Sequence, residues 1–175
     1  RTGGTNALRA LGRRRAAVVS AGDILKGTLP VLAVHSLAAQ GAEIWTSTWT
    51  VIAALFAVIG ATRSIWVGFK GGRGIATGFG TALAIAPLAL AAVAPIFLIV
   101  IWRTRIVSLG SLATAALFAP ALFIISYATT GMLDGALIAY GIVGPALVWF
   151  AHADNIARLR DGTERTFDTG MLQRD

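Results

Sequence analysis

The chain contains no cysteine and few charged residues, and both shortages restrict what it can be. The absence of cysteine excludes disulfides, thiolate metal sites and a cysteine nucleophile. Charged residues make up 13% of the 175 residues, whereas soluble domains average about 25%. Hydrophobic residues reach 56%, and the mean hydropathy is +0.74. Several apolar stretches approach the roughly 20 residues that cross a bilayer, so the composition indicates an all-α integral membrane protein.

Acidic residues are also scarce, because 8 Asp and Glu stand against 15 Lys and Arg, which gives a net charge of +7. In a membrane protein this excess favours positive-inside topology and an anionic substrate or lipid surface, and we expect no nucleic acid partner. The chain does not begin with Met and starts in a polar segment, so we expect a portion upstream of it. We interpret residues 1–175 as a single membrane domain.

A glycine-rich loop between two apolar runs is the most distinctive stretch of the sequence. Gly68-Phe69-Lys70-Gly71-Gly72-Arg73-Gly74-Ile75-Ala76-Thr77 combines four glycines with two cations and then becomes apolar. Glycine allows positive φ and close backbone approach to a ligand. We expect the loop to lead into a helix N-terminus, which favours an anion. The two interpretations are a phosphate site at a membrane surface and a tight turn with snorkelling cations.

The apolar segments predict the topology. Spans are expected at 16–39, 49–60, 108–126 and 136–150, with Ser108 as an N-cap and with Trp45 and Trp49 as interfacial anchors. Loops are expected at 40–48, 61–74 and 127–135, and a polar tail at 151–175. The loops 40–48 and 127–135 contain no Lys or Arg, so every cation lies on one side, with Lys26 within the membrane near it. The positive-inside rule makes that side cytoplasmic.

Residues 75–102 are apolar throughout but too long for one comfortable span, and Pro87 and Pro95 interrupt them. One span would place Arg103 and Arg105 on the side opposite Arg73. Two short helices that meet near residues 86–87 would return these arginines to the same side. We favour the two-helix interpretation, since short helices are tolerated where they pack against protein.

Polar residues in or beside the spans mark a candidate site. Asp23 and Lys26 are three residues apart and share a helix face, so they are expected to pair and to face the protein interior or a polar cavity. A purely structural pair is the alternative. His152 and Asn155 have the same spacing, and a lone histidine there would more often be structural. His35 we interpret as structural or interfacial.

Five motifs in order resemble those of the bacterial acyl-phosphate:glycerol-3-phosphate acyltransferase family. The motifs are Thr2-Gly3-Gly4-Thr5-Asn6-Ala7-Leu8-Arg9, Asp23-Ile24-Leu25-Lys26-Gly27, Gly68 to Thr77, Arg105-Ile106-Val107-Ser108-Leu109-Gly110-Ser111, and His152 to Glu164. Each motif alone is weak, but the ordered set covers nearly the whole chain and is specific.

The resemblance implies a helical membrane enzyme with its site at the cytoplasmic face of the inner membrane. It implies transfer of a fatty acyl group from acyl phosphate to the 1-hydroxyl of glycerol 3-phosphate, which gives lysophosphatidic acid and phosphate for phospholipid synthesis. No cofactor, metal or acyl-CoA is implied, and the partners are the two substrates and membrane lipid. The glycine motif is implied to bind glycerol phosphate.

The candidate residues divide by expected role. The catalytic candidates are His152, Asn155 and Arg9. The substrate-binding candidates are Thr5, Asn6, Lys26, Gly71, Gly72, Arg73, Gly74, Arg105 and Ser108. The structural candidates are Asp23 and Glu164. His152 is expected either to orient the hydroxyl or to accept its proton, and the phosphate of the substrate is the alternative base.

The chain departs from the family pattern at two positions of the glycine motif. Ala61 follows Gly60 where the family has histidine, and Arg73 stands where lysine is common. The first span of the family and the start of its first motif lie upstream of residue 1. A divergent inactive member, a transporter for an organic phosphate and a structural subunit are therefore the rival interpretations. A transporter would place some cations at mid-membrane with access from both sides. Here the outer loops lack polar clusters, and no half-repeat is visible in the sequence.

Overall fold

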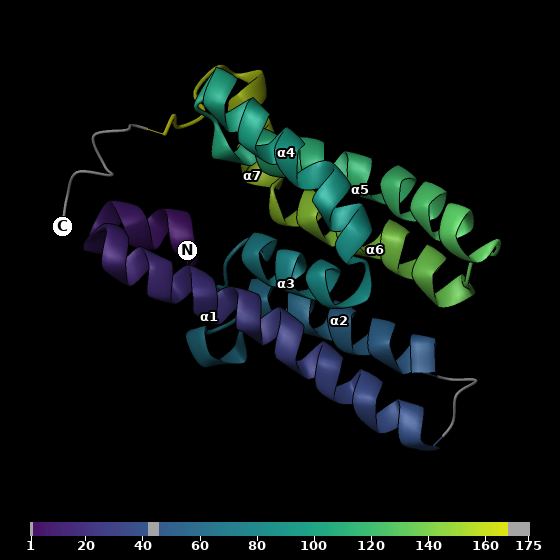
Figure 1. The fold of residues 1–175 in the computed structure, drawn as a ribbon. Coiled ribbons are helices and arrows are strands. Elements are labelled where there is room, and N and C mark those ends of the chain that lie inside the picture. The colour runs from purple at the N-terminus through teal and green to yellow at the C-terminus, as the bar shows by residue number, and fades with distance from the viewer. Residues whose placement is uncertain (1, 42–45, 168–175) are drawn as a thin grey trace.

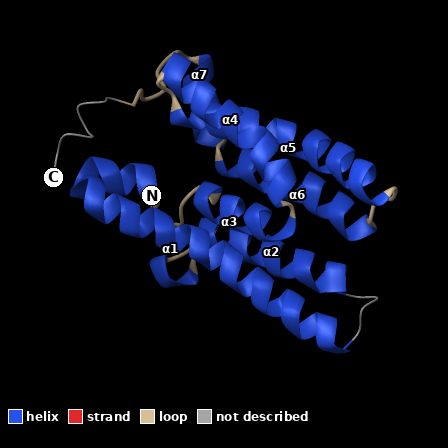
Figure 2. Cartoon of the chain, in the orientation of Figure 1, coloured by secondary structure: helices blue, strands red, loops and turns tan. Residues whose placement is uncertain are grey.

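The computed structural model describes residues 2–41 and 46–167, and every regular element within them is helical (Figure 1; Figure 2). The elements in chain order are α1 (Gly4–Gly41), α2 (Thr46–Thr62), the 3-10 helix η2 (Ile65–Val67), α3 (Ile75–Ile85), α4 (Pro87–Thr104), α5 (Val107–Thr130), α6 (Gly135–Ala151) and α7 (Ala153–Arg160).

Four segments of the described chain are long and apolar enough to cross a membrane: α1, α2 extended to Val67, α4 and α5. The pair α6 and α7 would add a fifth, although the chain bends by 62° between them. The prediction of an integral membrane protein is therefore confirmed. Helix α3 has only 11 residues and is too short to span.

The apolar run 75–102 forms two helices, as the favoured interpretation predicted. Ala86 leaves the helical region with φ −142°, and Pro87 begins α4, because proline is accommodated in the first turn of a helix. Figure 1 shows α3 and α4 running in opposite directions, so the glycine loop and the end of α4 lie at the same end of the molecule. The expectation that Pro95 also interrupts the run was wrong, because α4 continues through it.

Helices also occupy polar segments in which the sequence predicted no span. The polar start of the chain is helical from Gly4, and it turns at Gly12, whose φ of 80° favours glycine. The polar tail contains α7. Residues 40–41 and 46–48 belong to α1 and α2, while Trp45 lies outside the described residues.

The boundaries of α5 also differ from the prediction. Ser108 is not its N-cap, because Ile106 occupies that position and Ser108 lies in the first turn. The helix runs on to Thr130, so the loop expected at 127–135 is shorter. Asp134 caps α6, since its carboxylate accepts a hydrogen bond from the backbone N–H of Ala136 at 2.8 Å.

Glycines bring α1 and α3 into backbone contact. A Cβ on Gly27 would collide with the carbonyl of Thr77, and a Cβ on Gly80 would collide with the carbonyl of Ile24. The Thr28 hydroxyl donates to the Gly80 carbonyl at 3.0 Å across the same contact. This close approach places residues 24–28 of α1 against residues 77–81 of α3.

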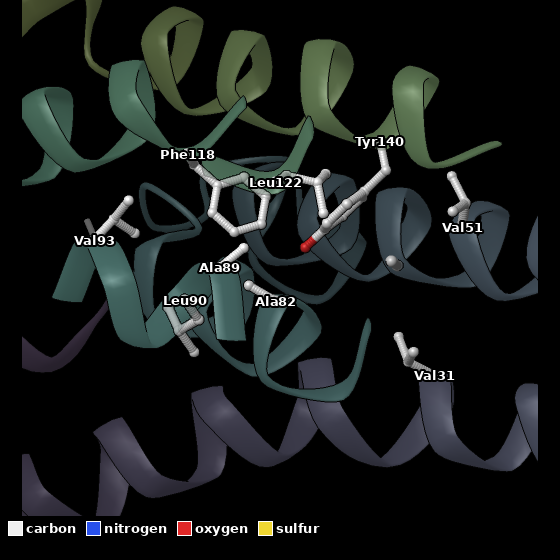
Figure 3. Packing of buried hydrophobic residues seen from close by; sticks show 10 residues of the cluster. Val31, Val51, Ala82, Ala89, Leu90, Val93, Phe118, Leu122 and Tyr140 are labelled. Atoms are coloured by element: carbon white, nitrogen blue, oxygen red, sulfur yellow. The ribbon is translucent and has the colours of Figure 1, made fainter. Parts of the chain in front are cut away.

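The buried core draws residues from all six helices α1 to α6 (Figure 3). The rings of Phe118 and Tyr140 pack edge to face with centroids 5.8 Å apart. The Tyr140 hydroxyl is 2.8 Å from the hydroxyl of Thr81, so its polar end is satisfied within the apolar layer. This cluster holds α3 against the α5–α6 pair.

Candidate functional site

A cavity of about 520 Å³ opens at the end of the molecule where α1 starts and α7 lies. Its wall is built from both ends of the chain. The polar residues that line it are Thr2, Thr5, Asn6, Arg9, Ser20, Asp23, Arg73, Thr77, Ser108, Ser111, His152, Asp154, Asn155, Arg158, Glu164 and Arg165.

The glycine loop and the first turn of α3 form one side of this cavity. Gly74 has a φ of 72° and precedes Ile75, so the loop turns through the left-handed region directly into the helix, as the sequence predicted. Residues 72–77 all line the cavity. The backbone N–H groups of a first helical turn have no partner within the helix. They therefore offer hydrogen-bond donors and a positive dipole end to an anion in the cavity.

Glu164 connects α5 and α7 on the opposite side. Its Oε1 accepts hydrogen bonds from the Ser108 hydroxyl at 3.0 Å and from Asn155 Nδ2 at 2.6 Å. Its Oε2 accepts from Arg158 Nε at 2.8 Å. The Glu164 side chain is only 8% exposed, so these charge-assisted bonds lie largely out of water. They join the start of α5 to α7.

Asp154 continues this network to the glycine loop. Its Oδ2 accepts from Arg158 Nη1 at 3.1 Å and from Arg73 Nη2 at 3.3 Å. Partial burial alone would lower the pKa of Arg158, but its hydrogen bonds to Asp154 and Glu164 outweigh this and raise the pKa. Arg158 therefore stays cationic between the two carboxylates.

His152 is 1% exposed and sits at the junction of α6 and α7. Its Nδ1 lies 2.8 Å from the carbonyl oxygen of Val148. A carbonyl only accepts, so Nδ1 carries the proton. In the neutral ring the lone pair is then on Nε2, which makes Nε2 a hydrogen-bond acceptor.

Asn155 is also 1% exposed. Its amide nitrogen is held by Glu164, whereas its Oδ1 is buried and has no hydrogen-bond partner in the described part of the chain. A buried acceptor without a partner is costly. The wall of the cavity thus presents an acceptor that a ligand donor could satisfy.

The structure brings most of the predicted site residues together. Those that line the cavity are Thr5, Asn6, Arg9, Asp23, Gly72, Arg73, Gly74, Ser108, His152, Asn155 and Glu164. Ala61, the position of the family histidine, also lines it.

Lys26, Gly71 and Arg105 do not line this cavity. The predicted pair of Asp23 and Lys26 is present at 3.2 Å, but the Lys26 side chain is 71% exposed rather than directed into the interior. Gly71 packs against the backbone of Ala61. Arg105 is exposed and ends α4 with a φ of 59°.

The sequence prediction did not include Asp154, Arg158, Ser111 or Arg165. The spacing of Asp154 and Arg158, four residues apart, is a signal for a helical ion pair that could have identified both. The sequence prediction placed His152 and Asn155 on one helical face but did not extend that helical spacing to Asp154 and Arg158. Within residues 2–41 and 46–167 no group of three histidine or acidic side chains is placed to hold a metal ion.

A second cavity of about 440 Å³ adjoins the first between α3, α4, α5 and α6. Its lining is almost entirely apolar, and it includes the Phe118–Tyr140 pair. Ile75, Phe79, Phe97 and Ser111 line both cavities. A ligand with an anionic head and an apolar tail would therefore fit across the shared wall.

The sequence matches the glycerol-3-phosphate acyltransferase family over residues 1–162. The chain belongs to this family. It is 38% identical to the glycerol-3-phosphate acyltransferase of Geotalea daltonii, over 94% of this chain and 79% of that protein. It is 40% identical to the protein of the same name from Methylorubrum extorquens, over 93% of this chain and 73% of that protein.

The fold agrees with solved acyltransferase structures. The crystal structure of PlsY, an integral membrane glycerol 3-phosphate acyltransferase, in its glycerol 3-phosphate form superposes with a TM-score of 0.84 at 30% identity, covering 99% of this chain and 81% of that one. The lysophosphatidic acid form gives 0.80 at 32% identity, covering 98% and 82%. This chain is therefore an integral membrane acyltransferase, as the motifs predicted.

Proposed function

We propose that this acyltransferase moves a fatty acyl group from acyl phosphate to the 1-hydroxyl of sn-glycerol 3-phosphate. The observation that carries the proposal is one cavity that holds an anion-binding helix N-terminus and two buried polar groups suited to a hydroxyl. The two similar PlsY structures are a glycerol 3-phosphate form and a lysophosphatidic acid form, which correspond to the acceptor and the product of such a transfer.

The phosphate of glycerol 3-phosphate binds at the glycine loop in this proposal. The N–H groups of the first turn of α3 and the guanidinium of Arg73 supply donors and charge. The ion pair with Asp154 holds Arg73 in place. Arg9, on the opposite helix, adds a second cation to the same cavity.

His152 and Asn155 orient the glycerol hydroxyl in the proposed complex. Nε2 of His152 accepts the hydrogen bond of the attacking hydroxyl, and Oδ1 of Asn155 accepts from the neighbouring one. The Nδ1 partner of His152 is a neutral carbonyl, which orients the ring without the stabilisation of an imidazolium that a carboxylate gives. This favours positioning by His152 over proton abstraction.

The acyl chain lies in the apolar cavity, and the acyl phosphate group lies at the wall shared by Phe97 and Ser111. The hydroxyl oxygen bonds to the acyl carbon, the bond from that carbon to the phosphate oxygen breaks, and the departing phosphate takes the hydroxyl proton. Because acyl phosphate is already activated, holding the two anionic substrates together is the main task of the site.

The site faces the cytoplasm from the inner membrane in this proposal. The connection of α5 to α6 at residues 131–134 contains no Lys or Arg, whereas the cavity end carries the glycine loop and α7 with their cations. This asymmetry supports the orientation through the positive-inside rule. Residues 1–175 contain no cysteine, so Met132→Cys and Thr163→Cys introduce single labelling sites into them. An impermeant thiol reagent should label position 132 in intact cells and position 163 only after lysis.

The activity is tested with the protein in vesicles, labelled glycerol 3-phosphate and acyl phosphate. Lysophosphatidic acid should form only when both substrates are present. Uptake of glycerol 3-phosphate into the vesicles without product would favour a transporter and refute the proposal.

A further inference from the structure

The segment between α2 and the glycine loop leaves the bundle and returns to the same point. The N–H of Gly72 donates to the carbonyl of Ala61 at 3.0 Å, and a Cβ on Gly71 would collide with the carbonyls of Ala61 and Thr62. Residues 63–70 therefore form a closed excursion with adjacent ends, which is the form of an Ω-loop. We call residues 63–70 the tip loop.

The tip loop exposes large apolar side chains. Ile65 is 66% exposed, Trp66 is 90% exposed and Phe69 is 62% exposed. Figure 1 shows this turn, which precedes α3, at the edge of the molecule and away from α4, α5 and α6. Such side chains in a row are costly in water but suit the boundary of a bilayer, where tryptophan is enriched.

Exposed cations flank these apolar side chains on both sides. Arg63 precedes them and Lys70 follows them, and both side chains are exposed. This alternation of cation, apolar tip and cation matches a bilayer surface with anionic headgroups above and acyl chains below. The membrane that α1 and α2 cross lies beside the loop, so the partner is a lipid surface rather than a protein.

The base of the tip loop is part of the cavity wall. Ala61 and Gly72, which close the loop, both line the polar cavity. The depth of the tip in the bilayer therefore fixes the level of the glycine loop relative to the headgroups.

We propose that the tip loop is an in-plane membrane anchor, with Ile65, Trp66 and Phe69 in the acyl region and with Arg63 and Lys70 on anionic lipid headgroups. It holds the mouth of the cavity at the headgroup level.

The test measures how deeply the tip is immersed. Val67→Cys labelled with a nitroxide reports from within the tip and leaves its larger side chains intact. Collision rates with oxygen, which concentrates in lipid, and with a water-soluble nickel complex are compared in full-length protein. Labels at Ile124→Cys, exposed on α5, and at Thr163→Cys, in the exposed segment after α7, give the lipid and water references.

We expect the label at position 67 to resemble that at 124 in bilayers with phosphatidylglycerol and to be less immersed in pure phosphatidylcholine. Arg63→Gln with Lys70→Gln should remove this difference, whereas Arg160→Gln, an exposed cation of α7, should not. Water accessibility at position 67 equal to that at 163 in both bilayers would overturn the anchor. Equal immersion in both would overturn the role of anionic lipid.

Discussion

Replacing Glu164 by Gln tests whether the carboxylate network organises the site. The carboxylate accepts three hydrogen bonds, from Ser108, Asn155 and Arg158, at 2.6 to 3.0 Å. A glutamine has one acceptor oxygen and one NH2 group, so its nitrogen must face a donor, either Asn155 or Arg158. At least one of the three bonds becomes a donor–donor contact, and the charge assistance of the others is lost.

The magnitude follows from the burial of the group. A hydrogen bond to a charged partner contributes about 1.5–3 kcal/mol, and the Glu164 side chain is only 8% exposed, so screening by water is weak. We expect a loss of roughly 3 kcal/mol. If this free energy is lost from the positioning of Asn155, the kcat/KM for glycerol 3-phosphate should drop about 100-fold, since roughly 1.4 kcal/mol corresponds to a factor of ten.

The assay is steady-state product formation in one detergent, with thermal unfolding measured in parallel. Asp161→Asn is the matched control, because that carboxylate is exposed on the same segment. It should change neither activity nor stability. An unchanged kcat/KM and midpoint for Glu164→Gln would refute the view that this carboxylate orders Asn155 and Arg158.

Three further predictions concern the two cavities. Gly72→Ala should raise the KM for glycerol 3-phosphate about tenfold, since overpacking costs about 1–3 kcal/mol. It should raise the KM for acyl phosphate less. Equal effects on the two KM values would indicate a merely structural turn. His152→Asn should keep part of the activity and the acidic limb of the profile of kcat against pH if His152 positions substrate. Loss of that limb together with a fall on the order of 10²–10⁴ in rate would make it the general base. Phe118→Leu should shift preference towards longer acyl phosphates by a few-fold in kcat/KM, at about 0.8 kcal/mol per additional buried methylene; an unchanged chain-length profile would move the acyl chain out of the apolar cavity.

The sequence predicted the spans and the broken run better than the polar ends. The start of α4 at Pro87 follows directly from backbone chemistry. A proline is accommodated in the first turn of a helix, whereas in the interior of a helix it is destabilising. Pro95 has the same chemistry, yet α4 continues through it, since surrounding packing can maintain a helix whose local preference is weak. The local preference of a proline therefore predicts a helix break only where packing against neighbouring helices does not keep the helix continuous.

The candidate site was predicted as a set of residues but not as a shape. The motifs named His152, Asn155 and Glu164, yet neither spacing nor composition indicates that Glu164 accepts from both α5 and α7. For Lys26 the spacing predicted the pair with Asp23 correctly. The direction of the Lys26 side chain was not predicted, because it depends on how α1 is rotated in the bundle. Contacts across elements require the three-dimensional packing.

The N-to-C order of synthesis determines when during translation this enzyme can become active. Among the described residues the cavity wall begins at Thr2 and ends at Glu164 and Arg165, so its first and last contributors lie more than 160 positions apart in the sequence. A nascent chain can insert its spans one after another, but the bonds that tie α7 to α5 form only when residue 164 has left the ribosome. The nascent protein should therefore stay inert in the membrane until this segment has emerged, and a chain stopped after Gly162 should insert normally and yet make no product. Product from that shortened chain would contradict this timing.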